Sequence, residues 1–184
     1  NFNGIYTIFN LSNNDILMDQ AVPVDKLGKD FALVKGTGTP SSGMETALII
    51  ATEDNTTFTI NGAASGVTLN SGQYFMVPTN YYTNQGNGLY NMGISATKNI
   101  YVYQLLAGTS VGNEYATGGF NFIPPLSCFM PNNIDQIAQI NMIGGTSYTT
   151  KLNIITQAGA TVTVNGAGLA ATTGPYPVPG NANW

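Results

Sequence analysis

The sequence contains no histidine and no arginine, and only 8% of its 184 residues are charged. Without histidine, Ser-His and Cys-His catalytic pairs and histidine-based metal centres are excluded. Nine acidic residues are spread thinly along the chain, and the sequence shows no recognisable pair for glycoside hydrolysis. Such pairs are set by distance in space, which leaves Glu45 and Glu114 open as members of one. We therefore predict that the protein is not an enzyme.

Positive charge is also scarce, because five lysines face nine acidic residues and the net charge is −4. Proteins that bind nucleic acids or anionic membrane surfaces depend on clustered lysine and arginine, so both partners are excluded. The chain has no apolar run of about 18 residues, the length that a membrane-spanning helix needs. Its polar residues are mainly Asn, Thr, Ser and Gly, a composition typical of secreted and cell-surface β-proteins. We therefore expect a secreted or outer-surface location.

The single cysteine, Cys128, cannot form a disulfide within the chain. It lies in the apolar segment 124–130, which favours a buried and unreactive thiol. Stability is therefore expected to come from the hydrophobic core and from hydrogen bonding in sheets.

Alternating apolar and polar residues dominate the sequence. The segment 57–60 alternates and runs directly into Asn61-Gly62, a strong signal for a tight hairpin because both turn positions require positive φ. Further strands are expected at 31–34, 67–69, 74–77, 89–95, 100–106, 138–142, 152–156 and 162–164. Short strands at this spacing predict an all-β fold of repeated antiparallel β-sandwich units, jelly-roll or Ig-like. A β-propeller-like arrangement is the alternative.

An internal repeat organises the chain. Residues 46–62 align without a gap on residues 150–166, and both copies end in Asn-Gly. The match continues from Gly72-Gln73-Tyr74 to Gly174-Pro175-Tyr176 and from Val77-Pro78 to Val178-Pro179. We predict the end of a preceding β unit at 1–40, one complete unit at 41–144 and the first half of a second unit at 145–184. Such a repeat suggests that this chain is one part of a longer array of similar units.

The segments 50–60 and 67–74, which read IATEDNTTFTI and VTLNSGQY, carry a family resemblance. Together with ISATKNIYVY at 94–103, they resemble the N-terminal domain family of the IgGFc-binding protein. Members occur in animal mucus proteins and in large secreted proteins of Bacteroidota-like bacteria, beside adhesin modules and secretion-sorting domains. The surface, rich in Asn and Thr and free of Arg, resembles the bacterial branch, whereas the cysteines expected in the animal branch are missing. Binding of immunoglobulin Fc is not carried over.

The densest group of oxygen ligands is Glu53-Asp54-Asn55. It is a candidate Ca²⁺ site, since this cation prefers several oxygen ligands. The favoured interpretation is a strand-connecting turn in which Asp and Asn bond to the backbone. The second copy has Gln157-Ala158-Gly159 at these positions, which suits a turn but not calcium. We expect no cofactor other than this calcium candidate.

A polar and aromatic loop gives the candidate ligand-binding residues Tyr81, Tyr82, Asn84 and Gln85. Its composition is that of antibody paratopes and glycan-binding loops. Tyr101, Tyr103 and Tyr115 are expected to add to the same surface. The alternative is that these rings cover sheet edges and bond locally.

These features predict a non-catalytic adhesion or binding segment of a large bacterial cell-surface protein. Its partner would be a surface glycan or protein, or a neighbouring module of the same polypeptide. The second hypothesis is a structural spacer, in which stacked repeats extend a stalk or filament and the loop chemistry is incidental.

Overall fold

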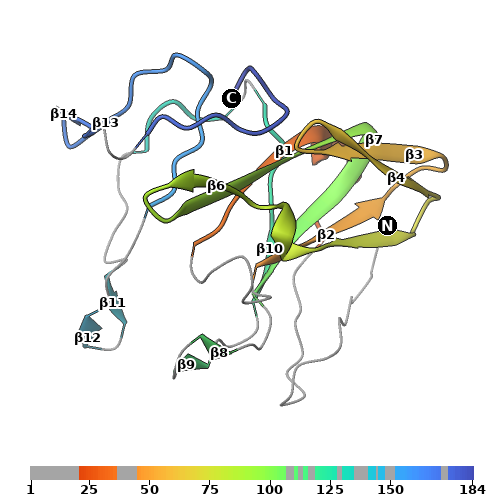
Figure 1. Cartoon of the computed structure of the whole chain (residues 1–184), viewed down its shortest axis with the longest axis horizontal. Coiled ribbons are helices and arrows are strands. Elements are labelled where there is room, and N and C mark those ends of the chain that lie inside the picture. Colours follow the sequence, from red (N-terminus) through yellow and green to blue (C-terminus); the bar gives the residue numbers. More distant parts are fainter. Residues whose placement is uncertain are drawn as a thin grey trace.

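In the computed structural model, the main antiparallel sheet curls around the long strand β7 (Figure 1). The structure describes residues 21–36, 45–106, 110–111, 114–115, 119–127, 130–134, 141–143, 145–147, 152–170 and 174–184. The all-β, antiparallel fold class is therefore confirmed. The sandwich or propeller arrangement of repeated units and the unit boundaries stay predictions.

Eight strands share the main sheet: β1 (Gly28–Val34), β2 (Thr46–Ala51), β3 (Thr56–Ile60), β4 (Ala63–Leu69), β5 (Tyr74–Val77), β6 (Thr83–Gly86), β7 (Leu89–Leu106) and β10 (Gly119–Phe122). Three small hairpins pair β8 (Ser110–Val111) with β9 (Glu114–Tyr115), β11 (Met142–Ile143) with β12 (Thr146–Ser147), and β13 (Thr163–Val164) with β14 (Ala167–Gly168). Single 3₁₀ turns lie at η1 (Val24–Lys26) and η3 (Thr79–Tyr81). None of the helical turns in the described ranges has the length and apolar character to cross a membrane.

Strand β7 is the axis of the sheet. Its first half pairs with β1, β3 and β6, and its second half pairs with β2 and β10. The sequence predicted two strands here, at 89–95 and 100–106, and the structure joins them into one. Strand β1, in the segment predicted to belong to a preceding unit, pairs with β7 over 28–34 and adds Phe31 and Leu33 to the larger core cluster.

Both faces of the central strands are buried. Along β2, Ala47, Ile49 and Ala51 belong to the larger core cluster, while Leu48 and Ile50 belong to a second cluster on the other face. The second cluster includes Tyr101, Tyr103, Leu105, Phe120 and Leu27. A strand that is buried on both faces reads as a continuous apolar run, which explains the segment 47–51.

The predicted hairpin at Asn61-Gly62 is confirmed. Asn61 and Gly62 have φ values of 53° and 81°, and Ile60 faces Ala63 across the turn. The side-chain oxygen of Asn61 accepts a hydrogen bond from the backbone N–H of Gly93, and its amide donates to the carbonyl oxygen of Tyr81. This asparagine therefore fixes the hairpin against β7 and against η3.

The second copy of the repeat keeps the hairpin but not the strands around it. Residues 152–156, predicted as a strand, are not in a strand, and of the segment 162–164 only β13 pairs, with β14. Figure 1 shows this hairpin at the periphery, away from β2 and β3. The strand prediction at 152–156 is wrong because a strand needs a neighbour, and no described residue pairs with this segment. Part of the predicted strand 138–142 and Cys128 lie outside the described residues.

Ile50 and Ile154 occupy aligned positions of the two copies, with exposed fractions of 6% and 44%. Replacing Ile50 with Ala should lower the free energy of unfolding by about 2–4 kcal/mol, since it removes buried methyl groups and leaves a cavity. Ile154→Ala is the matched control and should change it by less than about 0.5 kcal/mol. Urea unfolding followed by tyrosine fluorescence measures both. Equal losses would contradict the difference in packing described here.

Candidate functional site

The predicted tyrosine loop divides into a buried part and an exposed part. Tyr81 is 40% exposed, whereas Tyr82 is 4% exposed and lies in the larger core cluster. Of the four candidates, Tyr81 and Asn84 have exposed side chains, and the side-chain oxygen of Asn84 accepts a hydrogen bond from the backbone N–H of Gly86 in the same loop. Tyr101 and Tyr103 are also buried, with their rings stacked in the second core cluster. The side chain of Tyr115 lies outside the described residues.

Tyr82 sits beside a buried ion pair. The ammonium nitrogen of Lys35 is 3.7 Å from a carboxylate oxygen of Glu45, and both side chains are at most 5% exposed. The Tyr82 hydroxyl donates to the carbonyl oxygen of Glu45 at 2.9 Å, and the Lys35 ammonium lies 5.5 Å from the centre of the Tyr82 ring. Glu45, which was open as a catalytic carboxylate, also accepts a hydrogen bond from the backbone N–H of Gly36. Its contacts are those of a structural group.

Burial shifts the protonation of this cluster. It raises the pKa of the Tyr82 hydroxyl, and the negative charge of Glu45 raises it further. Burial lowers the pKa of the Lys35 amine, and Glu45 partly offsets that effect. Each shift disfavours the charged form of the buried group, as expected in a region of low dielectric constant.

The remaining loop candidate, Gln85, faces the C-terminal segment of the chain. We call residues 174–184 the strap. The Gln85 amide donates to the side-chain oxygen of Asn91 at 2.8 Å and to the carbonyl oxygen of Pro177 at 3.3 Å. Asn91 donates to the same carbonyl at 2.9 Å. In addition, the Asn87 amide donates to the Tyr176 hydroxyl at 2.9 Å, so this end of the loop holds the strap.

Three glycines bring the strap against the backbone of the first copy. A side chain on Gly93 would collide with the carbonyl oxygen of Pro179, and one on Gly180 would collide with the backbone nitrogen of Gly62. A side chain on Gly62 would begin 3.1 Å from the Cα atom of Gly180, which is also closer than ordinary van der Waals contact. Only glycine therefore allows the strap to lie on the Asn61-Gly62 turn and on β7, where Val178 becomes buried.

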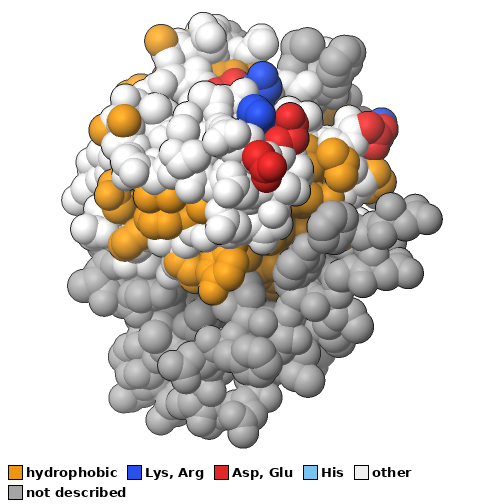
Figure 2. Space-filling model, turned by 90° about the vertical axis from the view of Figure 1, so that its right-hand side faces the viewer, with side chains coloured by type: hydrophobic (Ala, Val, Ile, Leu, Met, Phe, Trp, Pro, Cys, Tyr) orange, Lys and Arg blue, Asp and Glu red, His pale blue; other side chains and the backbone are white. Residues whose placement is uncertain are grey.

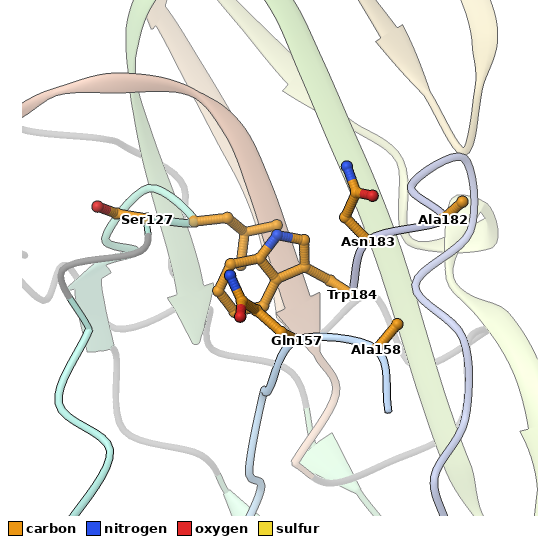
Figure 3. A pocket seen from close by; sticks show the side chains of 7 residues that line it. Ser127, Gln157, Ala158, Ala182, Asn183 and Trp184 are labelled. Atoms are coloured by element: carbon orange, nitrogen blue, oxygen red, sulfur yellow. The ribbon is translucent and has the colours of Figure 1, made fainter. Parts of the chain in front are cut away.

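The strap also closes one side of a cavity of about 410 Å³ that opens to solvent. The cavity, here called the Trp184 cavity, is lined by Leu126, Ser127, Gln157, Ala158, Ala182, Asn183 and Trp184. Figure 3 shows the Trp184 indole beside the Gln157 side chain, with Asn183 extending from the adjoining part of the strap. The lining side chains carry no charge.

Hydrogen bonds between backbone groups hold the three walls of the Trp184 cavity. Leu126 is attached to β1 by its N–H, which donates to the carbonyl oxygen of Asp30, and the Ala158 N–H donates to the carbonyl oxygen of Asn183. In the described part of the chain, no hydrogen bond engages the side-chain amides of Gln157 and Asn183. Sequence reasoning missed this cavity because its walls come from segments about 30 residues apart, and its one sequence signal is the chain's single tryptophan.

The calcium candidate forms a turn that is already occupied by a cation. Asn55 has a φ of 56°, and the Asp54 carboxylate accepts a hydrogen bond from the backbone N–H of Ser71. The Lys98 ammonium donates to the carbonyl oxygen of Asp54 at 2.8 Å and lies 3.7 Å from the Glu53 carboxylate. No cluster of three or more His, Cys, Asp or Glu side chains suited to a metal ion occurs in the described residues. The geometry is that of the predicted turn.

We expect calcium to have no effect on this turn, because Lys98 already compensates its negative charge. The melting temperature of the protein should be the same, within about 1 °C, in 5 mM CaCl₂ and in 5 mM EDTA. Differential scanning fluorimetry measures it. A higher melting temperature in calcium than in EDTA, if it is lost in the variant Asp54→Asn, would contradict this expectation and show that the ion displaces Lys98.

The buried hydroxyl of Tyr82 should make the protein sensitive to alkali. Above about pH 10 the unfolded chain loses this proton while the native state keeps it, so the free energy of unfolding falls as the pH rises. The slope from this one group approaches about 1.4 kcal/mol per pH unit. Urea unfolding between pH 8 and 11.5 should show a shallower decline for Tyr82→Phe than for the wild type. Lys35 and Glu45 are present in both proteins, so identical slopes would contradict the assignment to Tyr82.

The comparisons with known proteins give a family but no close relative. No curated protein matches the chain, and no solved structure matches it. The sequence model of the family described as IgGFc binding protein matches residues 2–184. This match spans both copies of the repeat, the hairpin at Asn61-Gly62 and the strap. The chain therefore belongs to the IgGFc-binding protein family, whose description is that of a binding protein.

Proposed function

We propose that this chain is a non-catalytic binding segment of a large bacterial cell-surface protein. It acts outside the cell and holds a surface glycan or protein through the Trp184 cavity, with Tyr81 and Asn84 as additional contacts. Membership of a family described as a binding protein supports this function.

The observation that carries the proposal is the chemistry of the Trp184 cavity. It combines one indole ring with two amide side chains, on Gln157 and Asn183, that are not engaged by described residues. An amide offers both hydrogen-bond donors and an acceptor, which matches the hydroxyl groups of a neutral sugar, and an aromatic face suits the C–H surface of a sugar ring. The volume of about 410 Å³ lies in the range usual for ligand sites.

The uncharged surface supports an extracellular role. On the face shown in Figure 2, Lys, Asp and Glu side chains are few, and most of the described surface consists of hydrophobic side chains, uncharged polar side chains and backbone. A neutral ligand suits such a surface, because long-range electrostatic steering contributes little to its binding. The bacterial origin rests on the resemblance of the sequence motifs.

A second function, a structural spacer, is favoured by the strap. The strap comes from the second copy of the repeat and is fastened to the first copy at Gly62, Gly93 and Asn91. A joint of this kind between successive copies would stiffen an array and extend it, whatever the cavity binds.

A glycan and mucin array probed with the full chain tests the proposal. The double variant Gln157→Ala/Asn183→Ala should lower the array signal at least tenfold, because both amides would be lost from the cavity. Tyr81→Ala should lower it by a smaller factor. Each of these side chains is exposed, so the melting temperature should stay within about 2 °C of the wild type.

Asn153→Ala is the control, since this exposed side chain lies near the cavity segment in sequence but does not line it. An unchanged signal in the double variant would remove the cavity from the binding function. A wild-type chain that binds no glycan or mucin would favour the spacer.

A further inference from the structure

The two copies of the repeat have the same local geometry at their hairpins. In the first copy Ile60 faces Ala63 and Thr59 faces Ala64. In the second copy the aligned pairs are Val164 with Ala167 and Thr163 with Gly168. The turn residues agree as well, with φ values of 53° and 81° at Asn61-Gly62 and 52° and 78° at Asn165-Gly166. The hairpin of the second copy therefore has the same cross-strand register as the hairpin of the first copy, although it is not part of the main sheet.

The apolar side chains of the two copies differ in burial. In the first copy Leu48, Ile50 and Ile60 are 3%, 6% and 2% exposed. Their aligned counterparts Leu152, Ile154 and Val164 are 50%, 44% and 42% exposed. The sequence thus retains a set of core side chains at positions where this structure leaves them in solvent.

In the first copy, strand β7 lies directly beside these positions in the sheet. Leu48 faces Tyr103, Ile50 faces Tyr101, and Ile60 faces Ile94 in the antiparallel register. The two tyrosines stack on each other, and Phe120 stacks on Tyr103 with ring centres 4.1 Å apart. An alternating Tyr-x-Tyr strand is therefore the structural complement of the Leu-x-Ile pattern in this repeat.

The segment 152–164 also has the properties of an open strand edge. It contains no charged residue and no proline, the residues that usually protect an exposed edge from pairing. Its described backbone takes part in few main-chain hydrogen bonds, among them those donated by the N–H groups of Ala158 and Ala160. An incoming strand could satisfy the remaining groups by β-augmentation.

We propose that residues 152–164 form a docking surface for one kind of partner, an extended uncharged strand of the β7 type with aromatic residues at alternate positions. The strand pairs with the segment 152–156, and its aromatic rings pack beside Leu152 and Ile154 as Tyr103 and Tyr101 lie beside Leu48 and Ile50. The side chains on which this inference depends, Leu152 and Ile154, do not line the Trp184 cavity, and no glycan is involved.

A labelled peptide with the sequence of residues 99–106, NIYVYQLL, and with blocked termini is the probe, and fluorescence anisotropy with the full chain is the measurement. The wild-type chain should bind the peptide, and Leu152→Asp/Ile154→Asp should weaken binding at least tenfold. Both side chains are exposed, so this variant should keep the near-UV circular dichroism of the wild type. A peptide with Ser in place of both tyrosines should bind at least tenfold more weakly than the probe.

A charge-matched control carries Ala64→Asp and Thr68→Asp, both at exposed positions of the first copy, and should bind the probe like the wild type. Equal binding by the Leu152→Asp/Ile154→Asp variant would place the peptide elsewhere and overturn the proposal. No binding of the probe by the wild-type chain would overturn it as well. The milder variant Ile154→Thr should give an intermediate affinity.

Discussion

The structure depends on hydrogen bonding along both edges of β7. This strand of 18 residues pairs with β1 and β10 along one edge and with β6, β3 and β2 along the other. Each partner is short, and a short strand on its own is not stable in water. The curl of the sheet follows, because strands that attach to successive parts of one long twisted strand are rotated relative to one another. The larger core cluster and the second cluster are the two faces of this arrangement.

The comparison of the two copies separates what local sequence determines from what neighbours determine. The Asn-Gly turn and the register of its hairpin form in both copies, because positive φ at these positions is a local preference. Residues 152–156 do not form a strand, although their sequence resembles that of β2. The turns at 53–55 and 157–159 are also aligned, but their contacts differ. Glu53 and Asp54 contact Lys98, while Gln157 and Ala158 line the Trp184 cavity.

Much of the sheet could be predicted from alternation and turn residues, including β1, β3, β5 and the hairpin at Asn61-Gly62. The candidate site could be predicted only in part. Composition identified the tyrosine loop, but nothing in the sequence distinguishes Tyr81 from Tyr82, since their burial is decided by a single 3₁₀ turn packed on the core. Lys98 reaches its acidic partners across 44 residues, and the walls of the cavity are also distant in sequence. Such contacts follow from the path of the whole chain, which no local pattern contains.

The prolines of the strap determine which side donates the hydrogen bonds between the strap and the first copy. Pro175, Pro177 and Pro179 have no N–H group, so at these positions the strap can only accept hydrogen bonds, and the amides of Gln85 and Asn91 do the donating. A segment without these donors cannot add itself to a β-sheet as an interior strand. At these positions the joint therefore holds the strap against the first copy without offering backbone donors to a further strand.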